Sequence, residues 1–280
     1  PEFLVIHLIT SLPLMLMILF DYKTKFILRV SGYPKLGFFR KILWKLAAKK
    51  LHMITCPTKG TYDFIKKSNL IESNKIKLLY DPILEIKKFS KKNVLANIDN
   101  LLIDNFYFAA GRLTKQKNFL FLCDAFNEIL KKYPKFKLLI LGEGEDYKKL
   151  KNYITYQKIE KNIELIGFQE NIFPYLINSK GFILSSLWED PGFVLIEAAF
   201  LNKIVFAADS NTGPSEILDN SSRGFLFRNN NHGDLVKKYN EFNQFEIKHW
   251  DTKRLKLKKY SKKFSLFQHY SNLNKILLKQ

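Results

Sequence analysis

Short apolar segments alternate with longer amphipathic segments along this chain, and that alternation limits its fold more than any other feature of the sequence. An apolar run of four to six residues is typical of a buried strand, and a longer run with helical periodicity is typical of a crossover helix. Such a series predicts parallel strands wound into an α/β sheet. In the second part of the chain the predicted strands are 106–109, 137–141, 163–166, 181–185 and 204–207, and the predicted helices are 118–133, 145–156, 172–178 and 193–201.

The first part of the chain shows the same alternation. Its predicted strands are 3–8, 25–30, 52–56 and 75–80, and its predicted helices are 13–20, 38–51 and 58–67. Residues 3–20 approach the length of a membrane-spanning helix, but they contain a histidine and a proline. We therefore divide them into a strand and a helix, with Ser11 as the helix cap and Pro13 in the first turn. Because the chain begins at Pro1 just before an apolar strand, we expect an N-terminal part to be missing.

The net charge is +20, from 46 basic and 26 acidic side chains. A charge of this size favours a polyanionic partner, either a nucleic acid or an anionic membrane surface. Basic residues gather in 21–50 and in the tail from 246 onward. They lie on no recognisable nucleic-acid recognition element, which favours the membrane. A bias toward lysine in the whole proteome is the remaining alternative.

The chain has two cysteines, Cys56 and Cys123, in unrelated contexts. Their spacing fits neither a zinc site nor a disulfide framework, and it excludes a secreted disulfide scaffold. We therefore expect a reducing, cytoplasmic setting and no cysteine-based zinc site. With 46% apolar residues, the chain is also too hydrophobic to be mainly disordered.

The candidate site residues follow predicted strands, because doubly wound sheets bind ligands beyond the carboxyl ends of their strands. Gly111, Arg112 and Lys117 lie on the loop after the strand 106–109. A glycine, an arginine and a lysine at a helix start suit a diphosphate, although a solvated basic loop has the same composition. Gly142 and Gly144 follow the next strand and predict a tight turn beside a ligand, without the third glycine of a dinucleotide motif.

A third group of residues follows the strand 181–185. Glu189 precedes a helix that opens at Gly192 and Phe193, and Glu197 lies inside that helix. Carboxylates accept hydrogen bonds from sugar hydroxyls, and the first amides of a helix bind phosphate. The alternative is a pair of carboxylates at a helix start and on its solvent-facing side.

Five motifs succeed one another over about residues 106–240, and together they resemble a known family. In order they are Gly111-Arg112-Leu113 with Lys117, then 139–144, 165–168, Glu189 with Glu197, and 213–216. This order is similar to that of the family-4 glycosyltransferases of the GT-B fold, also described as glycosyl transferases group 1. Residues 29–34 resemble bacterial surface-polysaccharide members of that family.

The resemblance implies an α/β GT-B fold with two Rossmann-like doubly wound domains, the first of them incomplete. Residues 1–84 are then the C-terminal part of the acceptor-side domain, and 85–105 are a linker. Residues 106–245 form the nucleotide-sugar-binding domain, and 246–280 form a basic helical tail.

The resemblance also implies a retaining transfer of a sugar from a nucleotide donor, with a UDP-sugar favoured and no metal or other cofactor. Arg112 and Lys117 match residues that neutralise the donor diphosphate. Glu189 matches the carboxylate that orients the donor sugar, Glu197 the one that holds the ribose, and His7 a histidine near the sugar, unless His7 is a buried core histidine. The remaining donor-binding candidates are Gly111, Gly142, Gly144, Gly167, Phe168, Gly192 and Phe193. Where the family often has Gly-Phe-Gly, this chain has Asp190-Pro191-Gly192, and a proline removes one amide donor.

The expected acceptor is a lipid-linked sugar or a glycan in bacterial surface polysaccharide synthesis. The basic surface then places the enzyme on the anionic inner face of the cell membrane, as a cytoplasmic peripheral protein that does not bind nucleic acid. Two alternatives stay open: a polyanion-binding protein, and a sugar-nucleotide-binding fragment that is catalytically incomplete.

Overall fold

The computed structural model describes residues 1–7, 11–30, 32–34, 36–85, 89, 105–210 and 212–278. They form two compact units. Unit 1 contains Pro1–Pro82 and Leu266–Gln280, and unit 2 contains Ile83–Ser265. The expected linker at 85–105 lies almost wholly outside the described residues.

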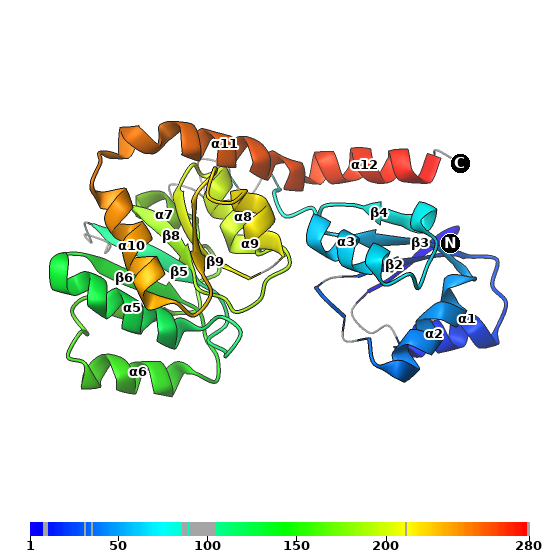
Figure 1. Ribbon diagram of the computed structural model, residues 1–280, viewed down its shortest axis with the longest axis horizontal. Helices are drawn as coiled ribbons and strands as arrows, with labels where there is room; N and C mark the ends of the chain where they lie inside the picture. Colours follow the sequence, from blue (N-terminus) through cyan, green and yellow to red (C-terminus); the bar gives the residue numbers. More distant parts are fainter. Residues whose placement is uncertain are drawn as a thin grey trace. The chain divides into compact units, whose positions relative to one another are not determined.

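Unit 1 contains a four-stranded parallel sheet whose strand order, β1-β2-β3-β4, follows the chain (Figure 1). Its elements are β1 (Phe3–Ile6), α1 (Ser11–Leu19), β2 (Lys25–Arg29), α2 (Phe38–Ala48), β3 (Leu51–Cys56), α3 (Lys59–Lys67), the 3-10 helix η1 (Ser73–Lys75) and β4 (Ile76–Leu78). Parallel neighbours are connected by right-handed crossovers, so α1, α2 and α3 cover the same face of this sheet. Every strand and helix predicted in this part is present, but the strand predicted at 3–8 is Phe3–Ile6 and the one predicted at 75–80 is Ile76–Leu78; residue 8 lies outside the described residues.

Two predicted helix ends in unit 1 were wrong. Ser11 is the first residue of α1, not its cap. The helix predicted to end at 51 ends at Ala48, and Leu51 begins β3, where it lies opposite Phe26 of β2. Leu51 is 3% exposed, so burial in the sheet determines its conformation rather than helical periodicity. By contrast Thr58 starts α3 as a cap whose hydroxyl accepts a hydrogen bond from the Thr61 amide.

Unit 2 contains a six-stranded parallel sheet in the order β10-β9-β8-β5-β6-β7. Its strands are β5 (Phe106–Ala110), β6 (Lys137–Leu141), β7 (Ile163–Gly167), β8 (Gly181–Leu184), β9 (Ile204–Asp209) and β10 (Phe225–Arg228). The chain runs outward from β5 to β7, then crosses to the other side of β5 and runs outward again from β8 to β10. This reversal between β5 and β8 makes the sheet doubly wound, as predicted.

Helices cover both faces of the sheet in unit 2. On one face lie α5 (Phe119–Lys132), α6 (Tyr147–Tyr156) and α10 (His232–Asn243), which contact one another in series (Figure 1). The helices α7 (Phe173–Asn178), α8 (Phe193–Phe200) and α9 (Gly213–Leu218) belong to the other face. Because both faces are covered, all five residues of β5 are buried, which explains its continuous apolar sequence. The sequence prediction ended at 207 and did not include α9, β10 or α10.

The basic segment 246–280 is helical as predicted, but the two units share it. The 3-10 helix η3 (Ile247–Trp250), α11 (Asp251–Ser261) and the 3-10 helix η4 (Lys262–Phe264) belong to unit 2, and α12 (Leu266–Leu278) belongs to unit 1. Buried Leu257 and Phe264 hold α11 and η4 in unit 2, where α11 contacts α8 and α9. The division between the two units falls between Ser265 and Leu266, inside the segment expected as a tail. Within the described part of the chain, no helix combines the length and hydropathy needed to cross a bilayer.

Backbone hydrogen bonds connect the loops after β5, β6 and β7. The Gly111 amide donates to Leu141 O (3.0 Å), and the Gly142 amide donates to Gly167 O (2.8 Å). A Cβ atom on Gly142 would overlap the carbonyl oxygen of Gly111, and Gly142 has φ +137°. Close approach of two backbones therefore requires glycine here, and the same packing positions the loops of the candidate site.

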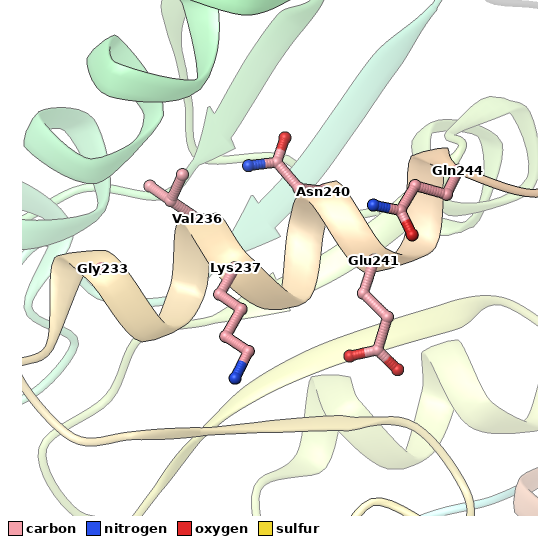
Figure 2. Close-up of a pocket in the computed structure, with 6 residues that line it drawn as sticks. All are labelled: Gly233, Val236, Lys237, Asn240, Glu241 and Gln244. Atoms are coloured by element: carbon pink, nitrogen blue, oxygen red, sulfur yellow. The ribbon is translucent and has the colours of Figure 1, made fainter.

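We predict that Gly142→Ala destabilises the protein by about 3 kcal/mol or more, because it combines a strained φ with a steric overlap. Denaturant unfolding measures this change. The matched control is Gly233→Ala, at an open hollow on the surface of α10 shared with Lys237 and Glu241 (Figure 2). The nearest atom to a Cβ there is 3.7 Å away, so the control is expected to change stability by at most about 1 kcal/mol. Equal midpoints for the two variants would contradict the packing argument.

Candidate functional site

The loops that leave β5 and β8 meet at the point where the strand order of unit 2 reverses, because β5 pairs with β8. Lys117, from the first loop, donates to the Oε1 atom of Glu189, from the second loop. The Lys117 side chain is 17% exposed and that of Glu189 is 7% exposed. A crevice at this reversal is where doubly wound sheets bind ligands, so the structure brings two predicted site residues to the expected place.

Glu189 is held from three directions. Besides Lys117, its carboxylate accepts a hydrogen bond from the Ser186 hydroxyl at 2.6 Å. Its backbone carbonyl accepts one from the Thr212 hydroxyl. A buried carboxylate with these partners has a fixed orientation, which suits a group that must meet a ligand in one geometry.

Further hydrogen bonds join the same two loops. The Gln116 side chain donates to Trp188 O at 2.9 Å, and the Leu187 amide donates to Gln116 O at 2.8 Å. The Ser185 hydroxyl donates to Lys117 O at 2.7 Å. These hydrogen bonds therefore connect the two loops around the ion pair.

A pocket of about 410 Å³ opens at the carboxyl ends of β5, β6 and β7, beside the start of α8. This volume lies within the range of small-ligand sites, roughly 300 to 1,000 Å³. Four predicted site residues line it, with six others from the same loops and helices. The predicted ones are Gly111, Arg112, Gly142 and Phe168, and the others are Ala110, Leu141, Glu143, Gln169, Ile172 and Val194.

The exposed groups of this pocket have distinct chemistry. Arg112 is exposed and supplies a cationic fork, and Phe168 is 68% exposed and supplies a flat apolar surface. The pocket wall is otherwise largely apolar, with Leu141, Ile172 and Val194. Such a surface suits a ligand that joins a planar ring to an anionic group.

Helix α8 begins beside this pocket. Gly192 is its N-cap, with φ +99°, and Phe193 is 56% exposed. The first amides of α8 have no carbonyl partner within the helix, so they are available to an anion, starting from Gly192 because Pro191 has no amide proton. Glu197 lies one turn further along α8 and is half-buried.

His7 lies in unit 1, directly after β1, and it is exposed. The alternative of a buried core histidine is therefore wrong. Its Nε2 atom lies 2.6 Å from the Nη1 atom of Arg29. Partial burial and the charge of Arg29 lower the pKa of His7 below its usual 6.5.

Of the remaining predicted residues, Gly144 and Gly167 shape the loops without lining the pocket. A Cβ atom on Gly144 would overlap Leu113, and the Gly167 carbonyl accepts the Gly142 amide. Sequence reasoning missed Ser186 and Thr212, which fix Glu189, and also Gln169 of the pocket wall. Ser186 has a signal in the sequence, since it follows a buried strand; Thr212 has none, because it comes from a loop 23 residues away.

Comparison with known proteins identifies the family of the chain. The profile of the family described as "Glycosyl transferases group 1" matches residues 96–264. An uncharacterized glycosyltransferase of Methanocaldococcus jannaschii is 36% identical over 205 residues, which are 70% of this chain and 50% of that protein. The N-acetylgalactosamine-N,N'-diacetylbacillosaminyl-diphospho-undecaprenol 4-alpha-N-acetylgalactosaminyltransferase of Campylobacter jejuni is 26% identical over 227 residues, 78% of this chain and 60% of that protein.

Among solved structures, Anabaena HepE in complex with UDP and glucose superposes with a TM-score of 0.82 at 16% identity. The match covers 100% of this chain and 78% of that one. This likeness confirms the predicted GT-B fold. The chain spans 50% and 60% of the lengths of the two curated relatives above.

We predict that Lys117→Met destabilises the protein by about 3 kcal/mol, because it leaves the Glu189 carboxylate buried without its countercharge. The double variant Lys117→Met/Glu189→Gln removes both charges and is expected to regain more than half of that loss. Denaturant unfolding of the two variants measures the difference. Lys115→Met, on the exposed part of the same loop, is the control and is expected to stay within about 0.5 kcal/mol of the wild type. A double variant less stable than the single one would contradict the buried-pair explanation.

Proposed function

The chain belongs to the glycosyl transferases group 1 family, and we propose that it takes part in the retaining transfer of a sugar from a nucleotide-sugar donor, a UDP-sugar in the first instance, to a lipid-linked or glycan acceptor. The observation that carries this proposal is the pocket at the carboxyl ends of β5, β6 and β7, beside the strand-order reversal of unit 2. Arg112 lines it, and the Lys117–Glu189 pair adjoins it through Gly111, on which the Lys117 side chain packs.

The donor is proposed to bind with its nucleotide in this pocket. Phe168 and the apolar wall suit the planar base, and Glu197 on α8 is proposed to accept hydrogen bonds from the ribose hydroxyls. UDP is favoured because the family uses it most, and HepE, which shares the fold, was solved with UDP and glucose.

In the transfer step, the bond between the sugar's anomeric carbon and the diphosphate oxygen breaks, and its electron pair stays on the diphosphate. Negative charge therefore grows on the leaving group. Arg112, an exposed cation that lines the pocket, is proposed to face the diphosphate, and Lys117 and the first amides of α8 are proposed to add to the positive potential. These groups are proposed to make a bound metal unnecessary.

Glu189 is proposed to orient the donor sugar by accepting hydrogen bonds from its hydroxyls. Lys117 and Ser186 both bind Oε1, so the other carboxylate oxygen is the one to meet a sugar. Lys117 thus has two tasks, since it fixes Glu189 and contributes charge near the diphosphate. His7 is proposed to contact the reacting sugar from the acceptor-side unit.

We predict that UDP raises the melting temperature of the protein more than GDP or ADP does. A ligand that binds only the folded state stabilises that state, by about 2.7 kcal/mol when its concentration is 100 times Kd. For Arg112→Ala and Glu197→Ala, the UDP concentration that gives the same rise in melting temperature is expected to be about tenfold higher or more. Each variant removes a hydrogen bond to a charged or polar ligand group. Thermal-shift titration measures this response.

The control for that titration is Lys115→Ala, on the same loop as Arg112 but away from the pocket of about 410 Å³. It is expected to keep the wild-type response. If no nucleotide stabilises the wild type, the donor-site proposal fails for this chain. If UDP binds but no sugar is transferred, the chain is a sugar-nucleotide-binding fragment.

The acceptor-side unit also has a surface that suits an anionic membrane. Helix α2 buries Trp44, Ala47 and Ala48 toward the sheet of unit 1. Its outer side bears an apolar row and, beside it, a cationic row, each with a spacing of four residues. The apolar row is Phe38, Ile42 and Leu46, and the cationic row is Lys41 and Lys45, continued by the C-cap residue Lys49.

The apolar row is unusually exposed for a soluble surface. Phe38 is 73% exposed and the adjoining Phe39 is 85% exposed, with their rings in edge contact at 5.7 Å. An interfacial helix buries such aromatic groups among the lipid headgroups, while each flanking cation adds about 1 kcal/mol near an anionic surface. We therefore assign the proposed peripheral membrane contact to α2.

We predict that the protein binds vesicles of phosphatidylcholine with phosphatidylglycerol more tightly than vesicles of phosphatidylcholine alone. Phe38→Ser/Phe39→Ser is expected to weaken binding at least tenfold, because each buried aromatic ring contributes about 1.5–3 kcal/mol. Vesicle co-sedimentation measures this binding. Tyr156→Ser removes an aromatic residue of unit 2 that is 82% exposed, and it is the control expected to bind normally. Tight binding to DNA with no preference for anionic vesicles would favour the polyanion-binding alternative.

A further inference from the structure

Three polar side chains are connected in series by hydrogen bonds at the carboxyl edge of the sheet in unit 1. His7 follows β1, Arg29 is the last residue of β2, and Asp81 lies three residues beyond β4. Asp81 is 6% exposed, Arg29 has a side chain that is 20% exposed, and His7 is exposed. The series of side chains therefore runs from a buried carboxylate outward to a histidine at the surface.

Asp81 fixes the guanidinium of Arg29. The Nε atom of Arg29 donates to Oδ1 of Asp81 at 2.9 Å, and Nη2 donates to Oδ2. Two parallel hydrogen bonds between a planar fork and a carboxylate define the plane and position of both groups. Because the pair spans β2 and the segment after β4, the fold of the sheet itself sets where the remaining nitrogen, Nη1, points.

That remaining nitrogen meets the imidazole of His7. Nη1 of Arg29 lies 2.6 Å from Nε2 of His7. An arginine has only N–H donors and keeps its charge in proteins, so Nε2 must be the acceptor. A ring nitrogen that accepts a hydrogen bond carries no proton, and the single proton of the neutral ring is then on Nδ1.

We propose that Arg29 and Asp81 are positioning residues that hold His7 as the neutral tautomer with its proton on Nδ1. His7 then presents a hydrogen-bond donor, and not a base, to whatever approaches it. Nδ1 lies on the opposite side of the ring from Nε2 and has no hydrogen-bond partner among the described residues. The Nδ1–H donor can bind an oxygen with a free lone pair, on a sugar hydroxyl or a phosphate of the substrate.

The electrostatics of the site support this protonation state. Partial burial is the first cause that lowers the pKa of His7, and the charge of Arg29 is the second. Asp81 opposes both, but it lies behind Arg29 and its effect is smaller. Because the pKa of His7 is lowered, its neutral form predominates at pH 7.5 by a wider margin than for an unperturbed histidine.

The contact of His7 with substrate rests on the function proposed above, whereas the tautomer does not. The test is therefore spectroscopic and needs no substrate. The protein is labelled with ¹⁵N at its five histidines, and long-range ¹H–¹⁵N spectra at pH 7.5 show which ring nitrogen is protonated. His7→Gln identifies the signals of His7 by their loss. The expected result is a protonated Nδ1 and an unprotonated Nε2.

Two variants test the positioning residues. Arg29→Met removes the donor to Nε2 and is expected to give a mixture in which the Nε2–H tautomer dominates, with the pKa of His7 moved toward 6.5. Asp81→Asn breaks the two-point contact and is expected to give a smaller shift of the same kind. Arg40→Met, an exposed arginine on α2 of the same unit, is the control and is expected to leave the His7 signals unchanged.

A proton on Nε2 of His7 in the wild type, or a charged imidazole at pH 7.5, overturns the proposal without any variant. An unchanged tautomer in Arg29→Met or in Asp81→Asn overturns the positioning role of that residue. If the tautomer is as expected but no nucleotide stabilises the protein, the donor-site proposal has failed and the tautomer assignment stands. The two failures are thus distinguishable.

Discussion

The ion pair between Lys117 and Glu189 joins the loops that follow β5 and β8, the two strands at which the sheet of unit 2 reverses its order. A charge in such a place is tolerated only with its partner, so the loops after β5 and β8 must approach each other for the unit to fold well. Their further hydrogen bonds, from Gln116 and Ser185, depend on that approach. The same pair adjoins the candidate donor pocket through Gly111, on which the Lys117 side chain packs, so the requirements of folding and of ligand binding meet at these two residues.

Unit 1 contains a similar ion pair. There a buried carboxylate, Asp81, fixes a cation, Arg29, at the carboxyl edge of a parallel sheet. In unit 2 the cation fixes a carboxylate that is proposed to meet the sugar, and in unit 1 the cation fixes a histidine. Both arrangements place one polar group in a single orientation by hydrogen bonds that the sheet geometry imposes. Precise orientation of this kind is what a site needs to stabilise one transition-state geometry.

The cations behind the net charge of +20 have different structural roles. Lys203 donates to the carbonyls of Ile177 and Ser179, and burial lowers its pKa to about 8. Lys253 of α11 donates to the carbonyls of Ser221 and Gly224, so part of the basic tail is a structural element of unit 2. By contrast Lys41 and Lys45 of α2 and its C-cap residue Lys49 are exposed. The composition suggests a polyanionic partner, but only the distribution of these cations indicates which surface is available to it.

The sequence by itself determined the alternating strands and helices, since apolar runs that are buried on both faces have no other stable arrangement in water. It also determined the loops that carry Arg112, Lys117 and Glu189, because strand ends are local features. It did not predict α9, β10 or α10, whose short or mixed patterns are decided by packing around residues such as Phe225 and Tyr239. Thr212 and the Arg29–Asp81 pair were equally hidden, because their partners are 23 and 52 residues away. Local periodicity records which side of an element is buried, whereas contacts between distant segments exist only once the strand order of each sheet is set.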